Sequence, residues 1–365
     1  MSKKIMLVFG TRPDAIKMCP LVKELKGREG FDVKVCVTGQ HRAMLDSVLD
    51  AFSVVPDYDL AIMKQGQDLF DITENILTKI RPVFEVEKPD VVLVHGDTST
   101  AFAAALAAFY LKIDVGHVEA GLRTDNIYSP YPEEFNRQAV SLIAKYHFAP
   151  TEKAKANLLA ENKRAESIFV TGNTAIDALN TTVKEQYSHP LLDWADGSRL
   201  ILVTAHRREN LGTPMEDMFS AIRKIADTYE DVKIIYPVHL NPAVKSVADR
   251  MLGGHERIRL IEPLDVVDCH NFISRSVLVM TDSGGIQEEA PALSKPVIVM
   301  RDTTERPEGV EAGTLKLAGT SADSIYNTCR LLLDNKEEYE KAARAINPYG
   351  DGTASKQIAD ILEVK

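Results

Sequence analysis

The chain has 365 residues, 45% of them hydrophobic and 26% charged, which is typical of a globular protein with two domains. Its 43 basic and 53 acidic residues give a net charge of −10, and the sequence has no basic stripe of the kind that nucleic-acid-binding proteins use. The four cysteines lack paired spacing, which argues against a disulfide framework or a zinc site, and the longest apolar stretch, residues 101–111, is too short to span a bilayer.

The first residues, MSKKIMLVFGTRP, hold only five consecutive apolar residues before Gly10 and Arg12, too few for the core of a signal peptide. We therefore expect a cytoplasmic protein that binds neither nucleic acid nor membrane.

Apolar runs alternate with helix-like patterns through the first half of the chain. The runs that predict strands are residues 5–9, 32–38, 91–95, 115–118 and 146–149, and helix-like segments begin near residues 13, 41, 69, 98 and 132. This alternation predicts a parallel sheet with helices on both faces. Residues 91–95, VVLVH, are apolar up to the last one, as in a strand covered on both sides.

The first predicted strand runs into the sequence FGTRPDAIK, residues 9–17. Gly10 allows a tight turn, and Pro13 suits the first turn of a helix. Arg12 and Lys17 would then lie near the positive end of the helix dipole, a good place for a phosphate. The segment matches neither the GxGxxG fingerprint nor a Walker loop. An ordinary strand–helix turn with solvated charges explains the same residues.

Three carboxylates occur within 37 residues of the first half. Asp97 and Glu119 each follow a predicted strand, and Glu133 lies in the loop after the second one. Residues just past the carboxyl ends of parallel strands line the binding crevice, so three acids there could move protons on and off one substrate. The alternative is a structural ion-pair network with Arg123 and Arg137.

The pattern restarts in the second half. The predicted strands are residues 200–204, 232–238, 258–261, 277–281 and 296–299, and helical segments begin near residues 214, 242, 265 and 284. We place the join near residues 170–173, with the polar stretch 187–198 as an alternative. The sequence thus predicts two doubly wound domains, with the cleft between them as the default ligand site.

Basic side chains follow the first strand of the second half in TAHRREN, residues 204–210. His206, Arg207 and Arg208 could stabilise or protonate a leaving diphosphate, since arginine suits bidentate phosphate contacts; a lone histidine is more often structural. His239 also ends a strand but gives no clear signal. Arg306, in RDTTERPEG, could equally belong to a surface loop with balanced charge.

A strand–turn–helix pattern occurs in TDSGGIQEEAP, residues 281–291. Ser283, Gly284 and Gly285 leave backbone amides open before a helix, which together form an anion cradle. Glu288 and Glu289 fall one turn into that helix, where a carboxylate could accept hydrogen bonds from a ribose diol. Alternatively, these carboxylates only complement the helix dipole.

Taken together, seven segments closely resemble the non-hydrolysing UDP-N-acetylglucosamine 2-epimerases of bacteria, in order and without large gaps. They are GTRPDAIK, HGDTST, VEAGLR, YPEEFNR, TAHRREN, TDSGGIQEEAP and RDTTERPEGVEAGT. The resemblance runs from about residue 5 to residue 352.

The resemblance implies a GT-B-like α/β fold of two Rossmann-type domains, with residues 1–170 and a C-terminal helix over 353–365 in the first and residues 171–352 in the second. It also implies a homodimer that interconverts UDP-N-acetylglucosamine and UDP-N-acetylmannosamine, with no metal and no cofactor. Direct deprotonation at carbon 2 is implausible because no carbonyl lies next to it, and the chain has no NAD fingerprint. The expected route is loss and re-addition of UDP through a 2-acetamidoglucal.

Roles follow for the residues that match the motifs of the family. The resemblance assigns proton transfer and positioning to Asp97, Glu119 and Glu133, without saying which acid serves which face of the sugar. It assigns the ribose to Glu289. The positions that hold or stabilise the diphosphate are Arg12, Lys17, His206, Ser283, Gly284, Gly285 and Arg306.

The sequence departs from the pattern of the family at several positions. Asp14 replaces a usual glutamate, Ser99 interrupts a threonine run, and Cys269 stands where an aromatic residue often lies near the uracil. Many members bind a second UDP-N-acetylglucosamine as an activator. The matching residues are Gln40, Arg207 and His239, whereas Ala43 and Gly66 replace longer polar side chains.

Three other functions fit parts of the sequence. A hydrolysing epimerase would release UDP and free N-acetylmannosamine from the same scaffold. A GT-B glycosyltransferase would need an acceptor site, of which the sequence gives no sign. A non-catalytic sugar-nucleotide sensor would not need the three acids.

Overall fold

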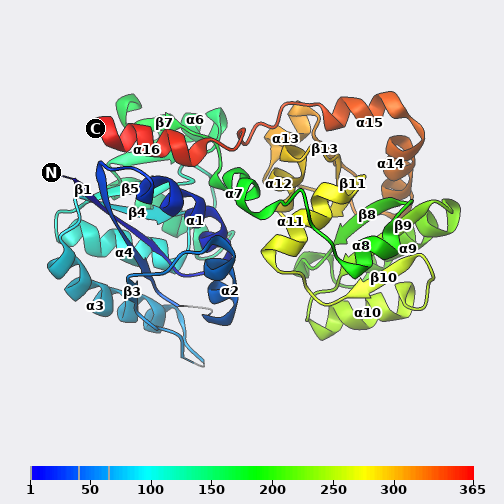
Figure 1. The fold of residues 1–365 in the computed structure, drawn as a ribbon, viewed down its shortest axis with the longest axis horizontal. Helices are drawn as coiled ribbons and strands as arrows, with labels where there is room; N and C mark the ends of the chain where they lie inside the picture. Colours follow the sequence, from blue (N-terminus) through cyan, green and yellow to red (C-terminus); the bar gives the residue numbers. More distant parts are fainter. Residues whose placement is uncertain (1, 40–41, 65) are drawn as a thin grey trace. The chain divides into compact units, whose positions relative to one another are not determined.

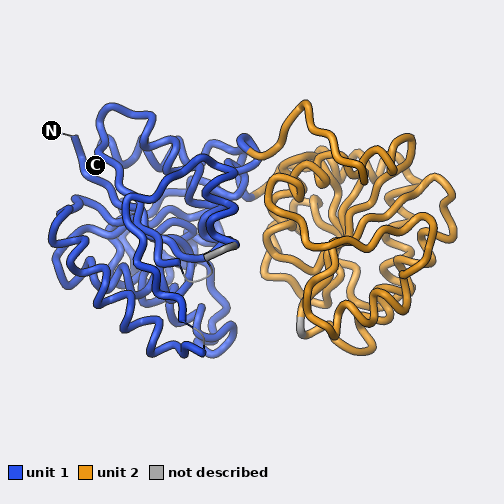
Figure 2. Tube along the Cα trace, turned by 60° about the horizontal axis from the view of Figure 1, so that its bottom comes forward, with its two compact units in different colours: residues 1–181, 349–365 blue, residues 182–348 orange. Residues whose placement is uncertain are grey.

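The computed structural model describes residues 2–39, 42–64 and 66–365, and the chain divides into two compact units (Figure 2). Unit 1 comprises Met1–Thr181 and Tyr349–Lys365, and unit 2 comprises Thr182–Pro348. Each unit is built on one sheet in which every recorded strand pair is parallel. The expectation of two doubly wound α/β domains is therefore confirmed.

The sheet of unit 1 has seven strands in the order β3-β2-β1-β4-β5-β6-β7 (Figure 1). Its strands are β1 (Lys3–Phe9), β2 (Phe31–Val37), β3 (Tyr58–Asp59), β4 (Val91–His95), β5 (Asp114–Val118), β6 (Tyr146–Ala149) and β7 (Ile168–Val170). Its helices are α1 (Arg12–Lys26), α2 (Arg42–Phe52), α3 (Leu69–Glu87), α4 (Ser99–Tyr110), α5 (Glu133–Ile143), α6 (Glu152–Ala160), a 3-10 turn (Ala165–Ser167), α7 (Thr174–Thr182) and α16 (Ala354–Val364).

Alternate residues of the central strands serve the two faces of this sheet. Met6 and Val8 of β1 and Val92 and Val94 of β4 pack in one core with α3 and α4. The residues between them are buried as well, as expected for strands with both faces covered. The C-terminal helix α16 lies beside α1 (Figure 1), and Lys3 Nζ donates to the Leu362 carbonyl at 3.0 Å.

Helix α1 begins where its sequence supplies a capping box. The Asp14 amide donates to Thr11 Oγ1 at 3.3 Å, and the Thr11 amide donates to Asp14 Oδ2 at 3.4 Å. Gly10, just before this cap, has no room for a side chain, because a Cβ atom there would lie 1.9 Å from Thr38 Oγ1. Close packing against Thr38 therefore explains why the predicted turn has a glycine at this position.

The sheet of unit 2 repeats this topology with six strands in the order β10-β9-β8-β11-β12-β13. Its strands are β8 (Arg199–Thr204), β9 (Val232–Pro237), β10 (Ile258–Ile261), β11 (Leu278–Thr281), β12 (Val297–Val299) and β13 (Leu315–Leu317). Its helices are α8 (Pro190–Ala195), a 3-10 turn (Arg208–Asn210), α9 (Thr213–Thr228), α10 (Pro242–Leu252), α11 (Val266–Arg275), α12 (Ile286–Ala292), α13 (Pro307–Ala312), α14 (Ala322–Asp334) and α15 (Lys336–Ala343).

The ten predicted strands all occur, to within about a residue at most ends. Three of the four shortest strands, β3, β7 and β13, were not predicted; they have two or three residues each. Within the described part of the chain, no helix is both long and apolar enough to cross a membrane.

Candidate active site

Asp97 and Glu119 lie at the same edge of the unit 1 sheet. The strands that precede them, β4 and β5, are parallel neighbours, and His95 pairs with Val118 at their carboxyl ends. The two carboxylates are close enough for the charge on Glu119 to raise the pKa of Asp97. The predicted meeting of these acids beyond the strand ends is what the topology produces.

The Glu119 carboxylate is surrounded by donors from three other segments. The ammonium group of Lys17, in α1, contacts Glu119 Oε2. Asn173 Nδ2, just before α7, donates to the same oxygen at 2.9 Å, and His95 Nε2 lies 3.6 Å away. These contacts favour an ionised carboxylate held in one orientation.

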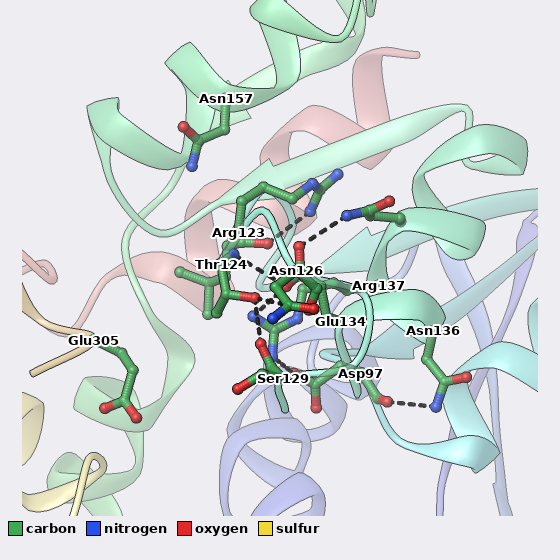
Figure 3. Close-up of polar contacts among 12 residues, drawn as sticks. Asp97, Arg123, Thr124, Asn126, Ser129, Glu134, Asn136, Arg137, Asn157 and Glu305 are labelled. Atoms are coloured by element: carbon green, nitrogen blue, oxygen red, sulfur yellow. Dashed lines mark hydrogen bonds and ion pairs between the residues drawn. The ribbon is translucent and has the colours of Figure 1, made fainter. Parts of the chain in front are cut away.

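Asp97 belongs to a second network, which reaches α5 (Figure 3). The Arg137 guanidinium contacts Asp97 Oδ2 and also lies 3.3 Å from Oε2 of the fully buried Glu134. Asn136 Nδ2 donates to the Asp97 carbonyl at 2.9 Å. Burial raises the pKa of Asp97, Arg137 works against this shift, and Glu119 adds to it. Of the structural ion-pair network considered above, the pair of Asp97 with Arg137 is present, whereas Arg123 forms its ion pair with Glu161.

Glu133 is the first residue of α5 and is half-buried. In the described part of the chain, no hydrogen bond or ion pair joins its carboxylate to Asp97 or Glu119. The side chain of α5 that contacts the Asp97 carboxylate is Arg137, one turn further on. The role of Glu133 in proton transfer stays a prediction.

Three residues of this group were not predicted from the sequence. His95 closes an apolar strand, Asp14 acts as a helix cap, and Asn173 lies in a loop 54 residues from its partner Glu119. A histidine ending the run VVLVH, two residues before Asp97, is the one local signal that could have pointed here.

In unit 2, two guanidinium groups flank the glycine turn between β11 and α12. A methyl group on Gly284 would lie 3.7 Å from Nη2 of Arg207 and 3.7 Å from Nη2 of Arg306. Gly285 caps α12, and Ser283 precedes the two glycines. The structure thus brings together residues from three predicted motifs and places the guanidinium groups of Arg207 and Arg306 beside the backbone of Gly284.

Asp282, which was not predicted from the sequence, joins the motif TAHRREN to the motif TDSGGIQEEAP through hydrogen bonds. Its side chain is fully buried, and Oδ2 accepts hydrogen bonds from the amides of His206 at 2.9 Å and Arg207 at 2.8 Å. Asn210 Nδ2 donates to the same oxygen at 3.2 Å. Asp282 therefore sets the backbone path after β8.

His206 lies on this segment, with Nδ1 3.4 Å from Asp282 Oδ1. Its ring stacks on that of His239, with centroids 5.5 Å apart and an interplanar angle of 10°. Burial lowers the pKa of His206; Asp282 opposes this shift, and His239 and Arg207 add to it. Without a ligand, His206 is therefore biased toward the neutral form.

Glu288 and Glu289 have different surroundings within α12. Glu288 is buried and forms an ion pair with Arg306. Glu289 Oε2 lies 3.4 Å from Nε2 of His270, a buried residue of α11. Glu289, the acid assigned to the ribose, thus contacts a buried histidine, and this histidine was not predicted from the sequence.

The predicted diphosphate residues of unit 1 lie at the start of α1, where Arg12 is the first helical residue. Of the predicted activator residues, Gln40 lies outside the described residues, as does the side chain of Ala43. Gly66 adopts φ +79° with open space around it. Among the residues that the structure describes, no group of three or more histidine, cysteine or acidic side chains could hold a metal ion.

Comparisons with known proteins place the chain in one family. The model of the family described as UDP-N-acetylglucosamine 2-epimerase matches residues 23–363. The UDP-N-acetylglucosamine 2-epimerase of Bacillus subtilis (strain 168) is 62% identical over 98% of this chain and 94% of its own length.

Two solved structures are similar throughout. A putative UDP-N-acetylglucosamine 2-epimerase from Listeria monocytogenes superposes with a TM-score of 0.95 at 56% identity, covering 100% of this chain and 96% of that one. The Neisseria meningitidis enzyme bound to UDP-GlcNAc gives a TM-score of 0.90 at 48% identity, covering 99% and 100%. The fold of this chain is accordingly GT-B-like. The chain belongs to the UDP-N-acetylglucosamine 2-epimerase family.

Proposed function

We propose that the protein interconverts UDP-N-acetylglucosamine and UDP-N-acetylmannosamine without hydrolysing either. The observation that carries this proposal is the pair of carboxylates, Asp97 and Glu119, at neighbouring strand ends with Lys17 and Arg137 against them. A relative from Neisseria meningitidis binds UDP-GlcNAc, which supports the same substrate here.

The proposed reaction begins with elimination. The proton leaves carbon 2 for an ionised side-chain carboxylate, which acts as the base; the electron pair of that C–H bond becomes the C1=C2 double bond, and the C1–O bond breaks with its electrons leaving on UDP. The product is a 2-acetamidoglucal. Return of a proton to the opposite face of carbon 2, with attack of UDP on carbon 1, completes the inversion without an oxidant or reductant.

Each of the two acids contacts one cation, but the groups around these pairs differ, and this difference suits different tasks. Glu119 contacts the ammonium of Lys17 and the amide of Asn173, so it starts ionised and is the better proton acceptor. Asp97 has a pKa raised by burial and is the easier of the two to protonate. In the direction from N-acetylglucosamine, we assign proton removal to Glu119 and proton return to Asp97.

The residues of unit 2 suit the leaving group. Arg207 and Arg306 flank Gly284, where their charges would stabilise the diphosphate as it develops negative charge. His206, biased toward the neutral form, would gain a proton as that charge develops beside it. Glu289 would accept hydrogen bonds from the ribose.

NMR of UDP-N-acetylglucosamine with the purified protein in deuterated water tests this function. The expected result is UDP-N-acetylmannosamine with deuterium at carbon 2, without added NAD or metal. Free N-acetylmannosamine with one equivalent of UDP would instead identify a hydrolysing epimerase. Bridge-labelled oxygen-18 at the anomeric position should scramble within the diphosphate, and retention of the label during epimerisation would overturn the elimination.

We further propose that the protein works as a homodimer whose product feeds the synthesis of cell-surface polysaccharide. Support for the dimer comes from exposed apolar side chains on adjacent helices of unit 1, Phe109 on α4 and Phe135 and Leu142 on α5. Light scattering should give twice the mass of one chain, and Leu142→Glu should lower it to one. A wild-type monomer at micromolar concentration would contradict the dimer.

A further inference from the structure

One buried histidine has an arrangement that the proposed chemistry does not yet use. His95, the last residue of β4, is 4% exposed. Its Nδ1 lies 3.5 Å from Oδ1 of Asp14 and its Nε2 lies 3.6 Å from Oε2 of Glu119. Neither nitrogen forms a hydrogen bond within the described part of the chain, so these two ion-pair contacts are the polar neighbours of the ring. The ring is thus aimed at one carboxylate on each side.

The chemistry of the ring follows from its two neighbours. A neutral imidazole has one donor and one acceptor, so it would present a lone pair to one of the two carboxylates, whereas imidazolium offers a donor to each. Burial alone would lower the pKa of His95, but Glu119 and Asp14 outweigh this effect and raise the pKa to about 9. The geometry and the charge balance therefore both favour the imidazolium form of His95.

Asp14 is fixed from two helices, which makes it a firm anchor for the ring. It is buried, its Oδ2 accepts from the Thr11 amide at the start of α1, and Thr98 Oγ1, the cap of α4, donates to it at 3.4 Å. His95 consequently connects the anchored start of α1 to a carboxylate beyond β5.

We infer that His95 is a positioning residue, an imidazolium that bridges Asp14 and Glu119 and holds Glu119 ionised and correctly oriented for carbon 2. This inference rests on the proposed function of Glu119. Lys17 supplies a second cation to the same carboxylate from α1, but as a flexible point charge. The His95 ring, by contrast, is locked by burial on the sheet itself.

Replacing His95 by glutamine tests the role, because glutamine keeps a donor of similar reach but carries no charge. Loss of the charge should raise the pKa of Glu119, so the acidic limb of the kcat–pH profile should move to higher pH. We expect kcat at pH 7 to fall about 10–100-fold, the range found when a residue that orients a metal ligand is replaced, with KM changed by less than about threefold.

His147→Asn is the matched control, because His147 is also a buried histidine of the same sheet but lies on β6, with no hydrogen bond or ion pair to the described residues of the site. Its profile should match that of the wild type. An unshifted acidic limb in a folded His95→Gln enzyme would overturn the inference. Should His95→Gln fail to fold, Asp14→Asn replaces it, with a smaller shift in the same direction expected.

A second readout needs no turnover. Nitrogen-15 NMR of histidine-labelled, ligand-free protein should show His95 as imidazolium at pH 8, and Asp14→Asn should lower its titration midpoint. A neutral His95 at pH 8 would overturn the bridge. If the wild type shows the imidazolium but never exchanges the carbon-2 hydrogen, the proposed function fails and the bridge stands as structure alone.

Discussion

The ammonium of Lys17 contacts the carboxylate of Glu119 across 102 residues of sequence, joining α1 to the residue after β5. Glu119 holds φ at +63°, a left-handed conformation that is uncommon for residues other than glycine. A backbone cost of about 1–2 kcal/mol is consistent with a side chain that must point in one direction. Lys17, Asn173 and His95 then fix that direction.

The first prediction concerns this ion pair. Both side chains are largely buried, so Lys17→Met removes the closer of the two cations beside the Glu119 carboxylate and should lower the free energy of unfolding by about 3 kcal/mol. The double variant Lys17→Met/Glu119→Gln should regain most of that stability yet stay inactive. Urea unfolding and NMR turnover measure the two effects. Purely additive losses of stability would show that the pair is not coupled.

A second prediction follows from Arg137, which opposes the upward shift in the pKa of Asp97. In Arg137→Met the pKa of Asp97 should rise further, so the limb of the kcat–pH profile that reports this group should move to higher pH. Stability should also fall, because Glu134 would be buried without its cation. Arg81→Met, which breaks only an exposed pair with Glu85, is the control and should change neither.

How far the sequence predicts this site depends on the range of the interactions. Asp97 and Glu119 could be placed together because each follows an apolar run, and parallel strands present their carboxyl ends at one edge. Asp282 could not be found in this way, since TDS reads as an ordinary strand end and the hydrogen bonds of its side chain reach 72 residues or more along the chain. His95 and Asn173 were missed for the same reason.

The missed strands have a different cause. β3 and β13 have two and three residues, too few to show any periodicity, and β3 exists because Cys36 and Val37 offer it an edge. β7 likewise adds to the edge of β6. Such strands are set by the neighbouring strand and not by their own sequence.

The third prediction concerns acid sensitivity. Burial lowers the pKa of His117 to about 3 and that of His147 to about 4, against about 6.5 in an unfolded chain. Between about pH 4 and 6.5 the unfolded chain therefore binds more protons, and the free energy of unfolding falls as the pH falls. Each histidine should cost about 2 kcal/mol between pH 7 and pH 5.

His95 should act at the other end of the pH scale. Its pKa is raised, so its stabilisation is complete below about pH 6.5 and is lost as the pH rises through about 9. Urea unfolding at a series of pH values checks both windows. His147→Asn should flatten the acidic slope and His95→Gln the alkaline one, and a variant with the slope of the wild type would refute the corresponding assignment.

A fourth prediction concerns His270 and the acid proposed to bind the ribose. His270 accepts from or donates to Thr182 Oγ1 at 2.7 Å through Nδ1, and it faces Glu289 through Nε2. His270→Ala should therefore loosen Glu289 and raise KM about tenfold while leaving kcat within about threefold, as expected for a group that orients a binding residue. Isothermal titration with UDP should show a similar loss of affinity. An unchanged affinity for UDP would show that His270 does not orient Glu289.

The last prediction uses the glycine between the two arginines. Gly284 does not require a positive φ, and a methyl group on it would meet Arg207 and Arg306 at an ordinary contact distance of 3.7 Å, so Gly284→Ala should fold normally. The methyl would nevertheless occupy the space between the guanidinium groups, where we propose that the diphosphate binds. UDP affinity should fall at least tenfold with the melting temperature unchanged. Gly30→Ala, which meets only Glu363 Oε1 at 3.7 Å, is the control and should bind UDP normally. A phosphate in contact with both arginines and with the backbone of Gly284 leaves no room for the added methyl group. If Gly284→Ala binds UDP as tightly as the wild type, the diphosphate therefore lies elsewhere.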